Sequence, residues 1–203
     1  MNRPKRVLDL VLILAFGPLI VPVLLVVALA ILLVDGRPLF YTSKRLGLGS
    51  EPFAFHKFRS MVVDADRLRS AEANEADGPL YKVALDPRVT PLGALLRKYS
   101  LDELPQVLNV LRGDMHFVGP RPLPEEDIAR HIEEHGEHAP WAEARALVKP
   151  GITGLWQVMG RSDLPFERMV EFDMLYLEQW SPMKDVAILI RTIPAVLMGR
   201  GAR

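Results

Sequence analysis

Residues 10–34 read LVLILAFGPLIVPVLLVVALAILLV, a run of 25 residues without a charged or polar side chain. A helix of about 20 apolar residues is long enough to cross the hydrocarbon core of a bilayer. The run is longer than the apolar part of a secretory signal peptide, and no small-residue cleavage site follows it. We therefore predict a membrane-embedded helix within residues 1–36, followed by one domain over residues 37–203.

The flanks and the prolines of this run leave two membrane topologies open. Basic residues stand on both sides of it, namely Arg3, Lys5 and Arg6 before, and Arg37, Lys44 and Arg45 after. Positive charge therefore gives no clear orientation, as expected if both ends lie on the cytoplasmic side. Pro18 and Pro22 predict a bend, because proline removes a backbone donor and clashes with the preceding turn. A spanning helix and a re-entrant helix, which enters and leaves by one face, both fit this pattern.

Composition excludes several classes of protein. The 203 residues carry 25 basic and 25 acidic side chains and no cysteine. The charge balance excludes a disordered polar chain and a generic polycationic nucleic-acid binder, and we expect no nucleic-acid partner. The lack of cysteine excludes disulfides, thiol nucleophiles and Cys-ligated metal sites. Residues 1–60 carry a net charge of +5 and residues 61–203 a net charge of −5.

The rest of the chain alternates short strands with helices. We predict strands at 38–41 and 52–59, joined by a glycine turn. Further predictions are helices at 62–76, 92–98, 107–111, 125–146, 166–180 and 186–198, an extended loop at 119–122 and a glycine-punctuated loop at 149–161. The last helix is apolar with basic ends, and lies either in the core or in the membrane interface. The expected fold class is α/β and mainly helical: an N-terminal membrane helix plus one compact domain with short strands and interfacial amphipathic helices.

The hexapeptide SLDELP at 100–105 carries two adjacent carboxylates, Asp102 and Glu103. Its structural interpretation is a capping box with Ser100 at the N-cap. Pro105 argues against this register, because its ring would oppose the carbonyl four residues earlier and remove a hydrogen bond. A helix that starts nearer Pro105 leaves both carboxylates at its positive end. Adjacent anions repel each other, so we expect a divalent metal or an arginine close by.

Four arginines stand in rigid or apolar surroundings. They are Arg59 at the end of the second strand, Arg97 five residues before Asp102, Arg121 between Pro120 and Pro122, and Arg161 after a glycine. The planar guanidinium suits paired contacts with phosphate oxygens. Each arginine alone is typical of a surface ion pair, whereas the set indicates a polyanionic ligand such as a nucleoside diphosphate. The sequence contains neither a P-loop nor a G-x-G-x-x-G motif.

In their order along the chain, these motifs resemble those of the bacterial sugar transferases, the monotopic polyprenyl-phosphate phosphoglycosyl transferases. The resemblance runs from about residue 3 to residue 198. Besides the proline-broken helix it rests on Lys5-Arg6-x-x-Asp9, KFRSM at 57–61, DPRVT at 86–90, SLDELPQ at 100–106, VGPRP at 118–122, PGITG at 150–154, and Gln157 through Gly160-Arg161. No single motif decides the matter, but this many in the family's order is highly specific.

The resemblance implies an activity and a role for each matching residue. The family moves a sugar-1-phosphate from a nucleoside diphosphate sugar, commonly a UDP-sugar, to polyprenyl phosphate, a first membrane step of glycoconjugate or exopolysaccharide biosynthesis. It implies that Asp102 is the nucleophile of a covalent phosphosugar–aspartyl intermediate and that Glu103, with Asp102 beside it, holds Mg²⁺. The implied phosphate and nucleotide contacts are Lys57, Arg59, Arg97, Arg121 and Arg161. Asp9 with Arg6 is implied to tie the start of the helix to the domain.

The resemblance also implies a place in the cell. In the family the helix enters and leaves on the cytoplasmic face, which implies a monotopic protein on the bacterial inner membrane with the bilayer as a partner. A second copy of the chain, in a homodimer, is a further candidate partner. The sequence departs from the family at Gly17, Ser43 and His116, where Ser, Gln, and Ser or Thr are usual. Two alternatives remain: a membrane-anchored Mg²⁺-dependent nucleotide-sugar phosphohydrolase, and a non-catalytic membrane scaffold.

Overall fold

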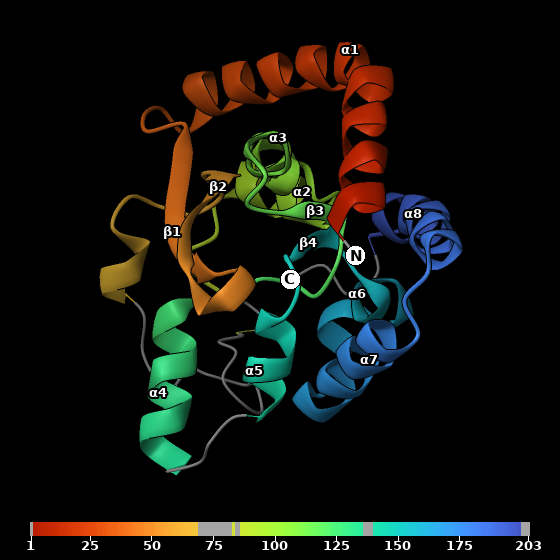
Figure 1. Ribbon diagram of the computed structural model, residues 1–203. Helices are drawn as coiled ribbons and strands as arrows, with labels where there is room; N and C mark the ends of the chain where they lie inside the picture. Colours follow the sequence, from red (N-terminus) through yellow and green to blue (C-terminus); the bar gives the residue numbers. More distant parts are fainter. Residues whose placement is uncertain (1, 69–82, 84–85, 136–139, 200–203) are drawn as a thin grey trace.

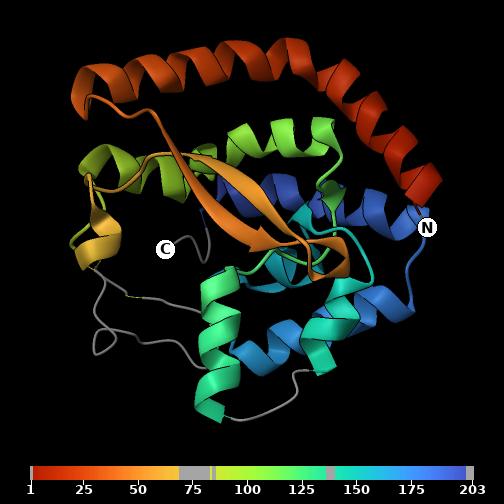
Figure 2. The same cartoon turned by 60° about the vertical axis from the view of Figure 1, so that its left-hand side comes forward.

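A long bent helix, α1 (Asn2–Val34), lies along one side of the computed structural model, which describes residues 2–68, 83, 86–135 and 140–199 (Figure 1). The helix contains Pro18 and Pro22 and turns through a marked corner, as the prolines predict (Figure 2). Its length and composition would allow it to cross a membrane. Its side chains are mostly exposed, Leu14 by 81% and Leu33 by 75%, which is unusual for leucine in an aqueous surface.

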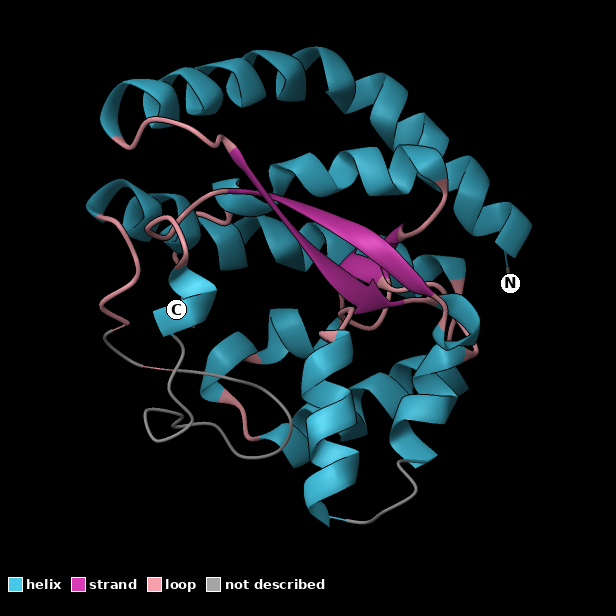
Figure 3. Cartoon of the chain, turned by 90° about the vertical axis from the view of Figure 1, so that its left-hand side faces the viewer, coloured by secondary structure: helices cyan, strands magenta, loops and turns pink. Residues whose placement is uncertain are grey.

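The predicted strand pair forms an antiparallel hairpin beneath α1, surrounded by helices (Figures 2 and 3). Strand β1 (Phe40–Leu46) is longer than predicted, because the polar residues after Tyr41 still pair with β2 (Pro52–Phe58) along its whole length. A 3-10 turn, η1 (Leu48–Ser50), joins the strands. Side chains two residues apart, or paired across the ladder, point to the same side. Arg45 and Lys57 therefore share one face of the hairpin.

Two helices and an intervening 3-10 turn follow, close to their predicted positions. They are α2 (Pro91–Lys98), η4 (Leu101–Gln106) and α3 (Val107–Arg112). The hydroxyl of Thr90 caps α2 by accepting a hydrogen bond from the Gly93 N–H at 2.9 Å. Gly93 lies against the end of β2, where a Cβ atom would stand 1.9 Å from the Ser60 carbonyl oxygen. α3 ends at Gly113, whose φ of 93° suits glycine.

The C-terminal half contains two strands and five helices within its described residues. They are β3 (His116–Val118), α4 (Glu125–His135), α5 (Pro140–Ala146), β4 (Gly151–Thr153), α6 (Leu155–Met159), α7 (Phe166–Glu178) and α8 (Pro182–Leu197), with a 3-10 turn, η5 (Arg161–Asp163). β3 and β4 pair in parallel, with His116 opposite Gly151. The predictions of helices at 166–180 and 186–198 are confirmed, and α8 begins four residues earlier than predicted.

Three predictions in this map need correction. The predicted loop at 149–161 contains β4 and α6. Its glycines suggested a loop, but they serve close contact between backbones, since a Cβ on Gly151 would lie 2.1 Å from the Gly119 nitrogen. The helix predicted at 125–146 is two helices, and residues 136–139 lie outside the described part of the chain. Of the helix predicted at 62–76, residues 62–68 are described and form a turn followed by a short 3-10 helix, η2 (Ala65–Leu68), in place of an α-helix, and residues 69–76 lie outside the described part.

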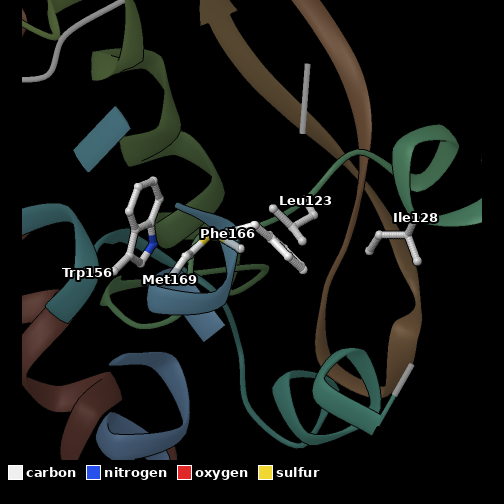
Figure 4. Packing of buried hydrophobic residues seen from close by; sticks show 5 residues of the cluster. All are labelled: Leu123, Ile128, Trp156, Phe166 and Met169. Atoms are coloured by element: carbon white, nitrogen blue, oxygen red, sulfur yellow. The ribbon is translucent and has the colours of Figure 1, made fainter. Parts of the chain in front are cut away.

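Buried side chains form several adjoining clusters that unite these elements. Leu123, Ile128, Trp156, Phe166 and Met169 pack together between α4, α6 and α7 (Figure 4). A second cluster joins the C-terminal part of α1 to the hairpin and α2 through Val27, Ile31, Phe58 and Leu96. Phe55, on the face of the hairpin that carries Arg45 and Lys57, packs instead with Val110 and Met115. Clusters thus pack against both faces of the hairpin, and Arg45 and Lys57 are partly buried on one of them, whereas Lys44 is exposed.

Candidate active site

The turn η4 holds the two adjacent carboxylates in a conformation that neither sequence interpretation predicted. Ser100 adopts a left-handed conformation, with a φ of 54°, and its side chain caps no helix. A 3-10 turn begins at Leu101, and the α-helix starts only at Val107. Pro105 is tolerated because it precedes the first turn of α3, where backbone N–H groups lack helical partners in any case. Asp102 and Glu103 therefore lie in the first turn of the 3-10 segment.

Glu103 is bound by two cations from different elements. Lys57 of β2 donates to its Oε1 at 2.8 Å. Arg121 donates to the same oxygen at 2.5 Å and to Oε2 at 3.1 Å, a paired contact typical of arginine with carboxylate. Asp102 is 5% exposed, and its Oδ2 lies 3.7 Å from the Lys57 ammonium. Among the described residues, the Asp102 carboxylate accepts no hydrogen bond, so it is the less engaged of the two.

Burial and charge divide the two carboxylates. Burial raises the pKa of Glu103, but the charges and hydrogen bonds of Arg121 and Lys57 outweigh burial and hold that pKa well below its usual value. Burial also raises the pKa of Asp102, and the negative charge of Glu103 raises it further. The positive charge of Lys57 lowers it, but by less, so the pKa of Asp102 lies above its usual value. Glu103 is thus a fixed anion, while the protonation of Asp102 responds to charges that bind beside it.

Further arginines surround this pair. Arg97 of α2 donates to the Ser60 hydroxyl at 2.9 Å, and its positive charge lowers the pKa of Asp102. Arg161 donates to the Ser100 hydroxyl at 2.6 Å, and its own φ is 52°. Burial and the nearby Arg121 charge lower the pKa of Arg45 to about 10. Arg45, which also lies within reach of the charge of Glu103, was missed from the sequence, although strand alternation places it on the Lys57 side of the hairpin.

The loop at residues 119–122 holds Arg121 in place, because the carbonyl groups of Pro120, Arg121 and Pro122 all accept hydrogen bonds. The Pro120 carbonyl accepts from the Gly151 N–H at 2.9 Å, and the Pro122 carbonyl accepts from Arg45 at 3.2 Å. The carbonyl of Arg121 itself accepts from the buried Arg145. Two prolines restrict the backbone and three hydrogen bonds hold it, so the guanidinium meets Glu103 from a rigid support.

Arg59 lies elsewhere, at the C-terminal end of α1. Its guanidinium donates to the carbonyls of Asp35, Gly36 and Arg37 at 2.6, 2.9 and 2.8 Å. Asp35 also accepts from the Thr90 hydroxyl at 2.8 Å. These contacts hold the segment after the apolar helix against β2 and α2. The structure thus gives Arg59 a supporting position, and its contact with a substrate stays a prediction.

The N-terminal end of α1 is tied to the domain by three side chains. Arg6 donates to the Val110 carbonyl and, at 2.7 Å, to that of Leu111. Asp9 is buried and accepts from the Phe117 N–H at 3.0 Å, and pairs with His116 Nδ1 at 2.5 Å. The third side chain, Lys5, was not predicted. It lies buried beside α8 and bonds Asp185 at 2.8 Å, Tyr176 and the Val118 carbonyl.

The residues present fit a magnesium ion whose ligands come partly from the protein and partly from a substrate. Among residues 2–68, 83, 86–135 and 140–199, no group of three or more acidic or histidine side chains forms a ready metal site. Mg²⁺ commonly binds through one or two carboxylates together with substrate phosphates. Asp102, adjacent to Glu103 and without a hydrogen bond from the described residues, offers such a carboxylate.

Taken together, five cations face two carboxylates. Lys57, Arg45, Arg97, Arg121 and Arg161 come from the hairpin, α2, the loop at 119–122 and η5. The excess of positive charge suits a ligand that carries several negative charges, such as a diphosphate. The least engaged anion at its centre, Asp102, is a side chain that can act as a nucleophile.

Comparison with known proteins agrees with this chemistry. A family model described as bacterial sugar transferase matches residues 1–199. The chain is 40% identical, over 83% of its length, to the exopolysaccharide production protein ExoY of Sinorhizobium fredii, covering 74% of that protein. It is 40% identical, over 83% of its length, to the undecaprenyl-phosphate galactose phosphotransferase of Salmonella typhimurium, covering 35%. It is 39% identical, over 95% of its length, to the UDP-glucose:undecaprenyl-phosphate glucose-1-phosphate transferase of Caulobacter vibrioides, covering 69%. The chain thus spans about a third of the length of some relatives.

Proposed function

The chain belongs to the bacterial sugar transferase family, and we propose that it transfers a sugar-1-phosphate from a nucleoside diphosphate sugar to polyprenyl phosphate at a membrane surface. The observation that carries the proposal is the buried Asp102 beside Glu103, within a cluster of five cations. The names of the Salmonella and Caulobacter relatives support undecaprenyl phosphate as the acceptor, and that of the latter supports a UDP-sugar as the donor. The ExoY relative supports a role in exopolysaccharide synthesis.

In the first proposed step, a carboxylate oxygen of Asp102 attacks the donor phosphorus that carries the sugar. The bond from this phosphorus to the bridging oxygen breaks, nucleoside monophosphate leaves with that oxygen, and a phosphosugar–aspartyl mixed anhydride, an acyl phosphate, remains. In the second step, an ionised oxygen of polyprenyl phosphate attacks the same phosphorus. The bond between phosphorus and the aspartyl oxygen breaks, Asp102 returns as a carboxylate, and the lipid carries a diphosphate-linked sugar. No proton is transferred in either step.

The surrounding residues contribute position and charge to this chemistry. We propose that Lys57 and Arg121, which bind Glu103, stabilise the negative charge that the leaving phosphate gains. Arg97 lies close enough for its charge to stabilise the ionised form of Asp102. We propose that Glu103 and Asp102 hold Mg²⁺ together with donor phosphates, and that this ion neutralises the diphosphate when bound.

We also propose that α1 is re-entrant. A helix that crosses a hydrocarbon core of about 30 Å leaves its ends on opposite faces. Here both ends are held by one domain: Lys5 pairs with Asp185 at 2.8 Å, and Arg59 binds the carbonyls of residues 35–37 at the other end. The bend in the helix lets both contacts form at once (Figure 2). This arrangement supports a monotopic protein on the cytoplasmic face of the inner membrane.

The function is tested by nucleoside monophosphate release. Purified protein receives Mg²⁺, undecaprenyl phosphate and each of a panel of UDP-sugars, beside the Asp102→Asn variant. We expect lipid-dependent release of UMP that the variant lacks, whereas Asp64→Asn, a change at an exposed aspartate outside the cluster, retains it. Release without lipid would favour a phosphohydrolase. Binding of the donor without release in any combination would favour a scaffold and contradict the proposal.

The topology is tested by cysteine labelling, since the chain has no cysteine of its own. Single cysteines replace Arg3 and Arg37, exposed residues at the two ends of α1. We expect a membrane-impermeant maleimide to label neither position in intact spheroplasts and both in inverted vesicles. Labelling of one position in spheroplasts would mean that the helix spans the membrane.

A further inference from the structure

An apolar cavity of about 260 Å³ lies between η4, α6, α8 and α1. Its apolar wall includes Ile20 of α1, Leu104 of η4, Val158 of α6, and Ala195 and Val196 of α8. One water molecule needs a space of only about 10–15 Å³, and apolar cavities bind apolar ligands in preference to ordered water. The shape and lining of this cavity therefore suit a hydrocarbon group.

One rim of the cavity is polar and belongs to the carboxylate cluster. Ser100, Glu103 and Arg161 line it. Arg161 uses Nη2 to bind the Ser100 hydroxyl, while its Nη1 is buried and has no hydrogen-bond partner within the described part of the chain. A buried N–H group without an acceptor is unfavourable, and a phosphate oxygen is the acceptor that best suits a guanidinium. The rim is thus prepared for an anion at the end of an apolar ligand.

Exposed apolar side chains stand next in sequence to residues that line the cavity. Beside Ile20, Leu19 of α1 is 69% exposed. On α8, Ile193 and Leu197, which neighbour the lining residues Ala195 and Val196, are 61% and 69% exposed. Two helices with exposed apolar side chains therefore border the cavity, and such surfaces suit the acyl region of a membrane.

We propose that this cavity binds the first isoprene units of the polyprenyl acceptor, with the lipid's phosphate at Arg161. This inference rests on the proposed function and adds the direction of approach. A sugar nucleotide does not suit the cavity, because its hydroxyl and phosphate groups would lose water without gaining partners on the apolar wall. The acceptor thus reaches Asp102 from the side of α1 and α8, and the donor from the side of Lys57 and Arg121.

The binding site is tested directly with a photoreactive lipid. The full chain in lipid nanodiscs is irradiated with a polyprenyl phosphate that carries a diazirine on its first isoprene unit. We expect labelling of α8 that undecaprenyl phosphate suppresses and that Ala195→Trp and Val196→Phe, which fill the cavity, abolish. Met183→Trp, a change at an exposed residue of the same helix that does not line or border the cavity, retains it. Only variants that melt within a few degrees of the unmodified chain are compared, and the two cavity changes serve as alternatives.

Labelling that survives both cavity variants would overturn the proposal, because the lipid would then lie on the outer surface. Labelling that undecaprenyl phosphate does not suppress would overturn it too, since any phospholipid chain would then be the occupant. Neither result depends on turnover. An unmodified chain that shows specific labelling but no lipid-dependent UMP release would instead contradict the proposed function alone.

Kinetics supply a second test. In Ala195→Trp we expect the KM for undecaprenyl phosphate to rise at least about tenfold, the factor that excluding two buried CH₂ groups produces. The KM for the nucleotide sugar stays within twofold, and Met183→Trp changes neither constant. An equal rise in both constants would mean that the substitution disturbs the carboxylate cluster and would contradict a separate site for the lipid.

Discussion

The buried contact between Lys5 and Asp185 makes a sharp prediction about how α1 is held. Lys5 is 4% exposed and donates to Asp185, Tyr176 and the Val118 carbonyl at 2.8, 2.5 and 2.8 Å. In Lys5→Met the Asp185 carboxylate, 1% exposed, keeps two donors from the described part of the chain, the Tyr176 hydroxyl at 2.7 Å and the Trp180 N–H at 3.2 Å. Removing one partner of a buried ion pair costs about 3–5 kcal/mol, and the two remaining donors place this case near 3.

For a chain of this size, a loss of about 3 kcal/mol lowers the melting temperature by roughly 6–12 °C. The assay is thermal unfolding in a mild detergent, with limited proteolysis to report release of α1. Arg3→Met is the matched control, because Arg3 is exposed on the same helix and loses the same charge. It should change the melting temperature by less than about 2 °C, as exposed substitutions usually do.

The double variant Lys5→Met/Asp185→Asn separates a specific pair from general disturbance. The neutral amide oxygen can still accept from Tyr176 and Trp180, so no uncompensated charge remains buried. Desolvation of a buried pair offsets most of its attraction, so we expect the double variant to recover to within about 1 kcal/mol of the unmodified chain. The reasoning would be refuted if the losses of unfolding free energy in Lys5→Met and in Asp185→Asn simply added in the double variant, or if Lys5→Met behaved like Arg3→Met.

The remaining predictions concern the carboxylate cluster and its support. The nucleophile must be ionised and the pKa of Asp102 is raised, so kcat/KM should increase with pH through a limb above about 3.9, the ordinary aspartate value. Lys57→Met should move this limb to higher pH, since Lys57 lowers that pKa; an unmoved limb would mean that another group titrates. Arg121→Lys should lower kcat/KM by about 10–100-fold, the worth of a charged hydrogen bond, with an unchanged melting temperature; a loss below threefold would count against the paired contact. EDTA should leave the melting temperature of the free protein unchanged but abolish the stabilisation produced by a UDP-sugar. If the protein alone held the metal, EDTA would lower the melting temperature even without the UDP-sugar. Gly93→Ala should destabilise the fold by about 1–3 kcal/mol in thermal unfolding, because the new Cβ would stand 1.9 Å from the Ser60 carbonyl; no change would mean that α2 can shift freely.

The outcome at the arginines shows how residue type and residue position are determined separately. Arg59 and Arg121 both look suited to phosphate from the sequence, as each follows or lies within a stiff segment. In the structure Arg121 meets Glu103, whereas Arg59 binds the backbone after α1. Arg45, which the sequence indicated only as a basic residue after the apolar run, lies near Arg121 because β1 pairs with β2 over seven residues. Register across the hairpin, and not the local pattern, decides which charged side chains reach the carboxylates.

The sequence by itself determined the properties that depend on neighbouring residues. The apolar run and its prolines sufficed to predict a long, bent apolar helix, and the order of motifs sufficed to indicate the family. The helices predicted at 92–98 and 107–111 lie close to α2 and α3, because the turn before Leu92 and Gly113 after the second helix are local signals. These features are local, since propensity and hydrophobic pattern act over a few residues along the chain.

Only the tertiary structure decided which residues surround Asp102, how its pKa shifts, and that one domain holds both ends of α1. It also decided that β4 and α6 form where the sequence suggests a loop, because Gly151 and Gly119 can pack backbone to backbone. Each of these depends on contacts between residues far apart in the chain. Such contacts form only when the fold has brought the segments together, and their electrostatic strength comes from the burial that the fold itself creates.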